Sequence, residues 1–555
     1  MYILGISSFY HDSSACLFKD GELVFACEEE KFTGIKHDSS FPINTIEYIF
    51  SHYSITYDDI EMVCYYEDLN LKLKRVLSNI KKNFFTSPKY SLKSLVKILK
   101  NISDVNKHLR PFKGKVFYSE HHLAHQYYSF FTSDFERAIS LSIDGVGEID
   151  TLSYGLADDD GIEYHSLGKY PHSLGLYYST MTSFLGFKPN EGEYKLMGLA
   201  SYGNPSQYIG KLRSLIKFEK GELFCDMNIF CWDRSNRLMF DEKLSEFLGI
   251  LPRLTEEGIK PVHQNLAAAV QLRYEEVLFD IIKSLKNLGS TNLCLGGGSA
   301  YNGTANGKIV PNSDFEKIWI PVAPSDAGSC VGACIHYLVK NKKLNKRVTK
   351  NPFLGPEYNI EDYLNNFKNL NFIKFDDNIK LIRSIAEKIN EGKVIGWYQD
   401  KIEFGARALG NRSILADPTL ADMKSRINRL IKKREGFRPF APMVIKEKQD
   451  EFFYVADDVP YMNQIVKVKE QYADKLSAVV HVDGTSRIQT VYKDTMIYDL
   501  LLEFEKLSGF PIILNTSFNV KDKTMVLTPN DAVETFKDTD LDLLVIDNYI
   551  IHKIL

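Results

Sequence analysis

At 555 residues the chain is too long for one ordinary domain, and a norm of about 150 residues per domain predicts two or three. Its 44% hydrophobic and 25% charged residues are typical of a globular protein in water. The 68 basic and 72 acidic residues give a net charge of −4, which excludes a strong overall attraction to nucleic acid or to an anionic membrane.

The eight cysteines are scattered without a CxxC pair, and several stand in apolar runs. We therefore expect them to be reduced residues of the core. No basic segment leads into an apolar stretch at the start, and no apolar run is long enough to span a bilayer. These features predict a cytoplasmic protein.

Two segments share one layout of strands and turns. Residues 1–32, "MYILGISSFYHDSSACLFKDGELVFACEEEKF", read as three strands with an Asp-Gly hairpin turn between the second and third. Residues 138–170, "AISLSIDGVGEIDTLSYGLADDDGIEYHSLGKY", repeat the pattern, with Asp144-Gly145 in the first turn. Two such meanders, each followed by helical sequence, predict a duplicated α/β domain of the actin and sugar-kinase type. In that architecture the first turn of each half faces a nucleotide phosphate across a cleft.

The rest of the chain suggests two domains and one excursion. Residues 68–115 are rich in Lys, Leu and Ser, and such a stretch could bind a membrane or a partner, but we expect a solvated helical excursion. The polar, basic and proline-broken residues 346–352 are typical of a linker. We therefore expect domains at 1–345 and 353–555, the second being another α/β unit.

Three of the 13 histidines stand within five positions in "SEHHLAHQYYSFF". His121 and His125 are four residues apart, so on a helix they share a face, while His122 points elsewhere. The pair lacks the internal Glu of HExxH proteases, so by itself it leaves a metal site and ordinary packing equally open.

Two carboxylates favour the metal interpretation. Asp144 stands in a glycine-flanked turn and Asp326 opens a predicted helix, and both positions can reach a cleft. Two imidazoles and two carboxylates suit Fe(II), Mn(II) or Zn(II). In the first hairpin turn, His11 is the candidate general base, because its ordinary pKa is near the working pH, and Asp12 could orient it. The alternative for His11 is a turn residue whose ring caps the backbone.

The second half carries clustered cations that suit a phosphate site. Guanidinium forks bind phosphate in pairs of hydrogen bonds, and lysine adds a compact charge. Polar residues at alternate positions of "NTSFN" and "TSRIQTV" would share one face of each strand. The candidates are Arg407, Arg412, Lys432, Arg434, Arg438, Arg487, Asn515, Ser517 and Asn519. The alternative is that these arginines form surface salt bridges.

Several long motifs occur in a fixed order: "HHLAH", "IDGVGE", "GGGSAYN", "PSDAG", "EFGARALGNRSILADP", "REGFRPFAP", "HVDGTSRIQTV" and "ILNTSFN". With them the chain resembles the O-carbamoyltransferases of the nodulation-protein and cephem-antibiotic family over nearly its whole length. The resemblance implies an actin-like N-terminal domain similar to the tRNA threonylcarbamoyl-transferase catalytic subunit (TsaD-like). It also implies a C-terminal domain similar to the threonylcarbamoyl-adenylate synthase (YrdC-like).

The resemblance further implies how the residues divide the work. His121, His125, Asp144 and Asp326 would hold one metal ion, usually iron, which binds the phosphate of a carbamoyl-adenylate. The C-terminal domain would turn carbamoyl phosphate and ATP, with Mg²⁺, into that adenylate and pyrophosphate, and a hydroxyl acceptor would then attack the carbamoyl carbon. Implied nucleotide or adenylate contacts are Gly145, Gly297, Gly298, Asn302, Asn306 and Lys195 in the first domain, and Lys432, Met462 and Ser517 match pocket positions in the second.

Two other functions stay open at this stage. A threonylcarbamoyl-type tRNA modification enzyme shares both folds, although the neutral charge disfavours a large RNA footprint. A non-catalytic nucleotide-binding sensor would carry a degenerate metal site, whereas all four ligand positions are present here. We expect ATP, carbamoyl phosphate and a small natural product or sugar hydroxyl as ligands, no nucleic acid or membrane partner, and a homodimer.

Overall fold

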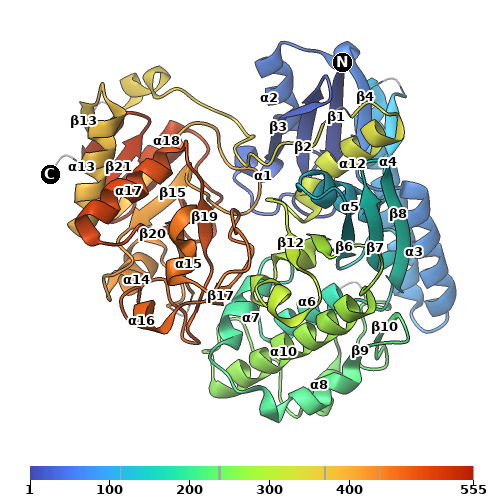
Figure 1. Cartoon of the computed structure of the whole chain (residues 1–555). Coiled ribbons are helices and arrows are strands. Elements are labelled where there is room, and N and C mark those ends of the chain that lie inside the picture. Colours follow the sequence, from blue (N-terminus) through green and yellow to red (C-terminus); the bar gives the residue numbers. More distant parts are fainter. Residues whose placement is uncertain (113, 236–238, 345, 368–369, 437, 554–555) are drawn as a thin grey trace. The chain divides into compact units, whose positions relative to one another are not determined.

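The computed structural model describes residues 1–112, 114–235, 239–344, 346–367, 370–436 and 438–553 (Figure 1). The chain forms two compact units. The first comprises residues 1–29, 37–305 and 309–350, and the second comprises residues 351–555 with the short segments 30–36 and 306–308. The change of unit at residue 350 falls inside the predicted linker.

The first sheet of unit 1 follows the predicted meander. Its strand order is β3-β2-β1-β4-β5, with β1, β2 and β3 antiparallel and β1, β4 and β5 parallel. Its strands are β1 (Tyr2–Ser7), β2 (Ser14–Lys19), β3 (Glu22–Glu28), β4 (Ile60–Tyr65) and β5 (Val116–Tyr118).

The second sheet repeats this topology. Its order is β8-β7-β6-β11-β12, with an antiparallel β6-β7-β8 meander followed by the parallel strands β11 and β12. The strands are β6 (Ala138–Ile143), β7 (Asp150–Asp158), β8 (Gly161–Lys169), β11 (Asn292–Gly296) and β12 (Lys317–Trp319). Because both sheets share strand order and direction, the predicted duplicated α/β fold is confirmed.

Two helices join the sheets of unit 1. Helix α12 (Asp326–Lys340) packs on β1 and β2, helix α5 (His121–Phe131) packs on β6 and β11, and the two helices pack on each other. A large apolar core lies between the second sheet and the helices around it. The helices of unit 1 also include α2 (Ile43–Tyr53), α3 (Leu69–Asn83), α4 (Pro88–Leu109), α6 (Leu174–Phe184), α7 (Glu193–Ala200), α8 (Ile209–Leu215), α9 (Glu242–Leu248) and α10 (Pro261–Ser284).

Unit 2 is built on one mixed sheet with a core on each face. Alternate residues of one strand face opposite sides, so Trp397 packs under α13 (Asn378–Asn390) and α17 (Met496–Ser508), and Tyr398 packs under α18 (Pro529–Lys537). The strand order is β13 (Leu370–Lys374), β22 (Tyr549–Lys553), β21 (Leu543–Ile546), β14 (Ile395–Tyr398), β15 (Arg412–Ala416), β20 (Ile512–Ser517), β16 (Ala441–Ile445) and β19 (Gln489–Val491).

One predicted strand was wrong. The segment "TSRIQTV" is divided into β18 (Thr485–Ser486), which pairs with β17 (Val466–Lys467), and β19 in the main sheet. Thr485 and Gln489 therefore belong to different sheets and do not share a strand face. The alternation of residue types could not reveal this division, because it depends on which partner strand each half meets.

All eight cysteines are free and buried, as expected. Among the described residues, no helix combines the length and the apolar character needed to cross a membrane.

Candidate functional site

The histidine pair lies at the start of helix α5. His121 is the first residue of the helix and His125 follows one turn later, so both imidazoles point the same way. Their Nε2 atoms lie 3.1 Å apart, and the exposed fraction of each side chain is at most 3%. Two ring nitrogens therefore converge on one buried point.

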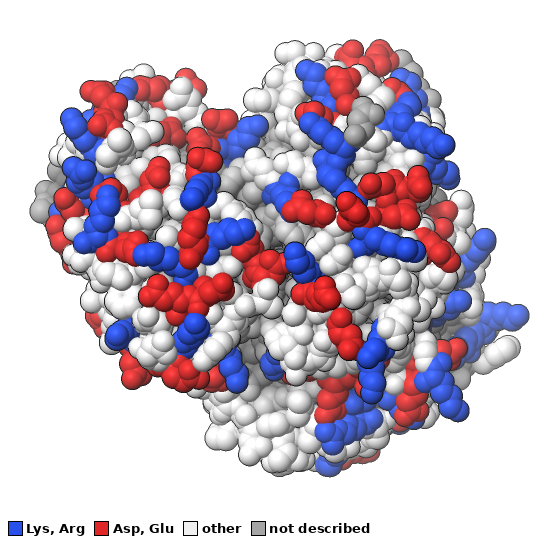
Figure 2. Space-filling view, in the orientation of Figure 1, with Lys and Arg blue, Asp and Glu red and all other residues white. Residues whose placement is uncertain are grey.

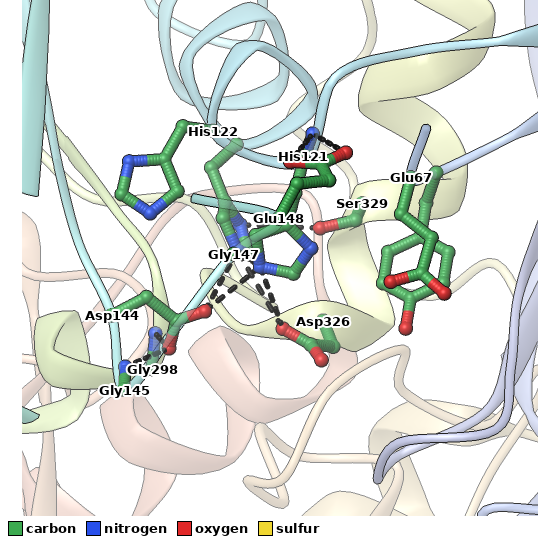
Figure 3. A network of polar contacts seen from close by, with 12 residues as sticks. Glu67, His121, His122, Asp144, Gly145, Gly147, Glu148, Gly298, Asp326 and Ser329 are labelled. Atoms are coloured by element: carbon green, nitrogen blue, oxygen red, sulfur yellow. Dashed lines mark hydrogen bonds and ion pairs between the residues drawn. The ribbon is translucent and has the colours of Figure 1, made fainter. Parts of the chain in front are cut away.

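Two carboxylates complete the cluster from other elements. Asp144 directly follows strand β6, and its Oδ2 lies 2.8 Å from Nε2 of His121 and 3.7 Å from Nε2 of His125. Asp326 opens helix α12, and its Oδ1 lies 3.5 and 3.6 Å from the same two nitrogens. One ligand atom from each of the four side chains lies within 4.8 Å of the others. Figure 3 shows both carboxylates turned toward the imidazole rings.

Backbone groups fix the orientation of Asp144. Strands β6 and β11 are parallel, so the turns that follow them lie at the same edge of the sheet. Asp144 Oδ1 accepts hydrogen bonds from the N–H groups of Gly145 (2.8 Å) and Gly298 (3.2 Å). This leaves Oδ2 directed at the histidines. Gly297 has φ of +89°, and a Cβ there would lie 2.3 Å from the carbonyl oxygen of Ile143, so the turn requires glycine.

Two further side chains, those of Glu148 and Ser329, contact the histidines. Glu148 is buried and accepts the backbone N–H of His121 at 2.9 and 3.1 Å, and the N–H of Asp68 at 2.6 Å. Ser329 lies 3.2 Å from Nδ1 of His125. Contacts of this kind orient metal ligands. Glu148 stands in the motif "IDGVGE", which was the one sequence signal for it, but its role was not predicted.

His122 has a different environment. Its Nδ1 lies 2.7 Å from the hydroxyl of Ser153, and Figure 3 shows its ring away from the four-residue cluster. The sequence spacing predicted this separation.

The donor set fits a divalent cation. Both carboxylate oxygens of Asp326 are buried without a hydrogen-bond partner, a costly state unless a positive charge is present. Nitrogen and oxygen donors without sulfur suit Fe(II), Mn(II) or Zn(II). The four residues can therefore hold such an ion.

The charges around the cluster move its pKa values. Burial alone would lower the pKa of His121, but Asp326 and Asp144 outweigh it and raise this pKa to about 9. Burial acts to raise the pKa of Asp144, yet His121 and His125 hold it well below the usual range. Without a metal, the carboxylates therefore keep a proton on His121.

The candidate base, His11, lies beside the same cluster. Its Nδ1 is 2.9 Å from Oδ2 of Asp12, and its Nε2 is 3.9 Å from Oδ2 of Asp326. Asp12 also contacts Nδ1 of His37 at 2.6 Å, a partner that the sequence did not indicate. Phe9 and Asp12 have φ of +68° and +50°, the left-handed region that non-glycine residues seldom adopt. A strained turn therefore presents His11 to the cluster.

The pKa of His11 depends on these neighbours. Burial would lower it, but Asp326 and Asp12 raise it to about 10. His11 is thus protonated at neutral pH beside these carboxylates, and a neutral His11 requires additional positive charge near Asp326.

The other residues predicted to contact the nucleotide or adenylate in the first domain are Asn302, Lys195 and Asn306, and each has a different environment. Asn302 exchanges two hydrogen bonds with Gln271, at 3.0 and 3.1 Å, so its amide already supports α10. Lys195 on α7 lies 5.9 Å from the ring centre of Phe187. Asn306 belongs to unit 2, where its amide donates to the carbonyl of Asn463 at 2.8 Å.

In unit 2, Lys432 is the centre of a buried polar group. It follows a π-helical turn, Ile427–Ile431, a local feature found often at functional sites. Its Nζ donates to the carbonyl and hydroxyl of Ser517, and to the carbonyl (2.9 Å) and the side-chain oxygen (2.7 Å) of Asn519. Burial, followed by Arg434 and Arg438, lowers the pKa of Lys432 well below its usual value.

Arginines surround this lysine. The pKa of Arg487 is lowered by burial and then by Arg407, Arg434 and Arg438, so the charges of these three guanidinium groups act on Arg487. Arg438 also contacts Glu435 at 3.5 Å. Like charges gathered in a partly buried place attract anions, because an anion relieves their mutual repulsion. This cluster, defined as Lys432 with Arg407, Arg434, Arg438 and Arg487, is therefore suited to a polyanionic ligand.

Arg412 has a structural role that sequence analysis did not foresee. It is fully buried, and its Nη atoms donate to the carbonyls of Gln399, Asn411 (3.1 Å) and Asp400 (2.9 Å). Its guanidinium also stacks 3.5 Å from the ring centre of Tyr398.

Asn515 and Met462 have distinct environments. Asn515 donates to the carbonyl of Ala408 at 3.0 Å and to the side chain of Gln489 at 3.1 Å. Met462 is buried with φ of +55°, an unusual conformation for this residue type.

Comparisons with known proteins identify the family. A family model described as carbamoyltransferase N-terminus matches residues 2–335, and one described as carbamoyltransferase C-terminus matches residues 386–553. The chain therefore belongs to the carbamoyltransferase family, and the resemblance found in the sequence is confirmed. As a member of that family it is a transferase enzyme.

Relatives span nearly the whole chain. Nodulation protein NolNO of Sinorhizobium fredii is 35% identical over 99% of this chain and 80% of its own length. NolO of Bradyrhizobium diazoefficiens is 37% identical over 78% of both chains. An uncharacterised protein of Synechocystis is 35% identical over 100% of this chain and 97% of its own. Among solved structures, full-length HypF in a phosphate- and nucleotide-bound form matches at a TM-score of 0.32 and 13% identity, covering 63% of this chain and 47% of HypF.

Proposed function

We propose that the chain is an ATP-dependent O-carbamoyltransferase with one chemical step in each unit. The observation that carries this proposal is the presence of two buried sites of opposite character in one carbamoyltransferase. Unit 1 gathers two carboxylates and two imidazoles suited to a metal ion, and unit 2 gathers cations suited to phosphates.

Unit 2 would activate the carbamoyl group. Water cleaves carbamoyl phosphate to carbamate and inorganic phosphate. A carbamate oxygen then attacks the α-phosphorus of ATP, the bond from that phosphorus to the bridging oxygen of the β-phosphate breaks, and carbamoyl-AMP forms as pyrophosphate leaves. The balanced reaction therefore consumes one water and releases one inorganic phosphate as well. Lys432, whose Nζ is positioned by Ser517 and Asn519, would contact the phosphates, and Arg434, Arg438 and Arg487 would bind them in forks.

Unit 1 would transfer the carbamoyl group. The hydroxyl oxygen of the acceptor attacks the carbamoyl carbon, the bond from that carbon to the adenylate oxygen breaks, and AMP leaves. Nε2 of His11 would take the hydroxyl proton, because Asp12 engages its Nδ1 and leaves Nε2 facing the cluster.

His121, His125, Asp144 and Asp326 would hold the metal, here proposed as Fe(II) with Mn(II) and Zn(II) as alternatives. When bound, such an ion supplies Lewis-acid charge to a phosphate leaving group. Neutralising Asp326 and Asp144 also lowers the pKa of His11 toward the range in which it can act as a base.

The acceptor would be a hydroxyl of a small natural product or a sugar. This proposal draws on the nodulation-protein relatives and on the chemistry of the transferred group.

The test is an assay without acceptor. The full chain is incubated with ATP, Mg²⁺ and carbon-14 carbamoyl phosphate, and carbamoyl-AMP, pyrophosphate and inorganic phosphate are measured. We expect the three in equal amounts. Labelled adenylate without pyrophosphate, or no adenylate in the metal-loaded protein, would contradict the proposed route.

A further inference from the structure

Helices α3 and α4 form a basic hairpin that contacts the candidate site where Arg75 donates to the carbonyl of Gly147, at 2.6 Å. The proposed function assigns no role to the rest of the hairpin. The two helices pack against each other and are joined by residues 84–87. Residues 69–103 contain no Asp or Glu, although the whole chain has more acidic than basic residues. The cations in this range are Lys72, Lys74, Arg75, Lys81, Lys82, Lys89, Lys93, Lys97 and Lys100.

Helix α4 carries apolar residues on two faces. One face is buried, and includes Ile98 and Val105. On another face Leu92, Val96 and Leu99 repeat at i, i+4 and i+7 and remain 65%, 59% and 52% exposed. A solvated helix needs only the first face, so the second face is left without an explanation from packing.

The connection between the helices adds aromatic residues. Phe85 is 93% exposed and Phe84 is 53% exposed, with the rings edge to face at 5.5 Å between centres. Leu77 on α3 is 46% exposed and lies two turns before Phe84. Apolar side chains thus continue from the exposed face of α4 to the tip of the hairpin.

Lysines run beside this apolar face. Four exposed lysines line one side of the repeat: Lys93, Lys97 and Lys100 each follow one of its members, and Lys89 lies one turn before Lys93. Within the part of the chain that the structure describes, none of these four has an acidic partner. By contrast, Lys72 pairs with Glu67 at 2.6 Å. In Figure 2 basic side chains project from the right-hand edge, where Figure 1 draws α3.

We propose that the α3–α4 hairpin docks on the surface of an anionic lipid bilayer. Such a surface offers phosphate or carboxylate headgroups to the lysines and an acyl boundary to the apolar side chains. The tip residues Phe84 and Phe85 enter between the headgroups, and the row of lysines stays at headgroup level. This interaction is peripheral and departs from our expectation of a solvated excursion without a membrane partner.

Charge and shape favour this occupant over two others. A nucleic acid would use the lysines but has no contact for an aliphatic row of Leu92, Val96 and Leu99. A second copy of the hairpin would bring two rows of unpaired lysines together, which is unfavourable. An anionic bilayer offers headgroup charges to the lysines and an acyl boundary to the apolar side chains.

The test is vesicle flotation with the full-length protein. Vesicles of phosphatidylcholine alone are compared with vesicles containing 30 mol% phosphatidylglycerol as the anionic probe, at two salt concentrations. We expect binding to the anionic vesicles at least about tenfold stronger than to the neutral ones, and weaker at the higher salt.

Two variants separate the lysines from the apolar tip. The first is Lys89→Gln, Lys93→Gln, Lys97→Gln and Lys100→Gln together, matched by Gln at Lys217, Lys260, Lys286 and Lys346, which are 41–66% exposed elsewhere in unit 1. The second is Phe84→Ser with Phe85→Ser, matched by Leu251→Ser with Leu254→Ser, whose side chains are 80% and 69% exposed. Each hairpin variant should lose about tenfold or more in vesicle affinity, and each matched control should bind like the wild type.

Three results would overturn the proposal. One is equal binding to neutral and anionic vesicles, or equal losses in the hairpin variants and their controls. Another is tight binding of a single-stranded oligonucleotide, lost in the lysine variant, without vesicle binding. The third is a solution dimer that the Phe84/Phe85 variant dissociates, without vesicle binding. Far-UV circular dichroism and the midpoint of thermal unfolding serve as a check that every variant is folded.

Discussion

Nε2 of His121 lies 2.8 Å from Oδ2 of Asp144, and the exposed fraction of each side chain is at most 5%. The two residues come from helix α5 and from the turn after strand β6, so the duplicated fold itself brings them together. Because Asp326 and His125 face the same point, removing any one of the four leaves buried charge without compensation.

The first prediction concerns metal affinity. His121→Ala should weaken binding of Fe(II) or Mn(II) by about a hundredfold or more, because a ligand is lost and its position is buried. His122→Asn is the matched control, since His122 contacts Ser153 instead. Affinity is measured by equilibrium dialysis with metal analysis. Equal losses in the two variants would exclude the four-residue site.

The second prediction concerns the glycine turn after β11. Gly297→Ala should cost roughly 1–3 kcal/mol of stability and weaken metal binding, because the new Cβ displaces Ile143 or moves the neighbouring N–H that orients Asp144. Gly221→Ala is the control, since Gly221 also has a positive φ, +81°, but nothing lies within 4 Å of its Cβ position. Thermal unfolding and dialysis give both quantities. A metal affinity unchanged in Gly297→Ala would show that this turn does not position the ligand.

The third prediction concerns Arg412. Arg412→Met should destabilise the protein by about 3 kcal/mol, because the buried carbonyl of Gln399 and the part-buried bonds to Asp400 and Asn411 lose their donor. Arg383→Met, at a residue 61% exposed, should change stability by less than about 0.5 kcal/mol. The midpoints of thermal unfolding are compared. Equal midpoints for the two variants would contradict a structural role for Arg412.

The fourth prediction concerns pH. Burial, with help from Lys340, lowers the pKa of His336 to about 4, and this side chain lies 2.9 Å from the hydroxyl of Ser119. The pKa of His336 in the folded protein is below the unfolded value of 6.5, so between these values the unfolded chain binds a proton that the folded chain does not. The free energy of unfolding is therefore unaffected by the titration of His336 above pH 6.5 and decreases as the pH falls toward 4. Between pH 7.5 and pH 5 the wild type should lose about 2 kcal/mol more unfolding free energy than His336→Gln. Parallel pH profiles for the two proteins would show that His336 does not titrate in this way.

Much of the fold and of the candidate metal site could be predicted from the sequence. The Asp-Gly turns and the repeated meander are local signals, and the spacing of His121 and His125 defines one helix face. Contacts between residues far apart in the sequence could not be predicted in this way. Glu148 supports the N-terminus of α5 through a single buried carboxylate, and no periodic pattern marks such a contact.

The arginines show the same limit. A cluster of basic residues in the sequence does not show which guanidinium donates its hydrogen bonds to backbone carbonyls. The structure shows that Arg412 does so, whereas Arg434 and Arg438 lie near Arg487. Likewise, Asn302 fits a ligand-contact motif, but its partner Gln271 lies on a helix 31 residues away in sequence.

The central claim is that activation belongs to unit 2 and transfer to unit 1. The direct measurement is acceptor-free formation of carbamoyl-AMP and pyrophosphate by Lys432→Ala, by His121→Ala and by Lys433→Ala, whose lysine is exposed beside Lys432. We predict that Lys432→Ala loses pyrophosphate release by about a hundredfold or more, while the other two retain it. Loss in His121→Ala with retention in Lys432→Ala would contradict the account.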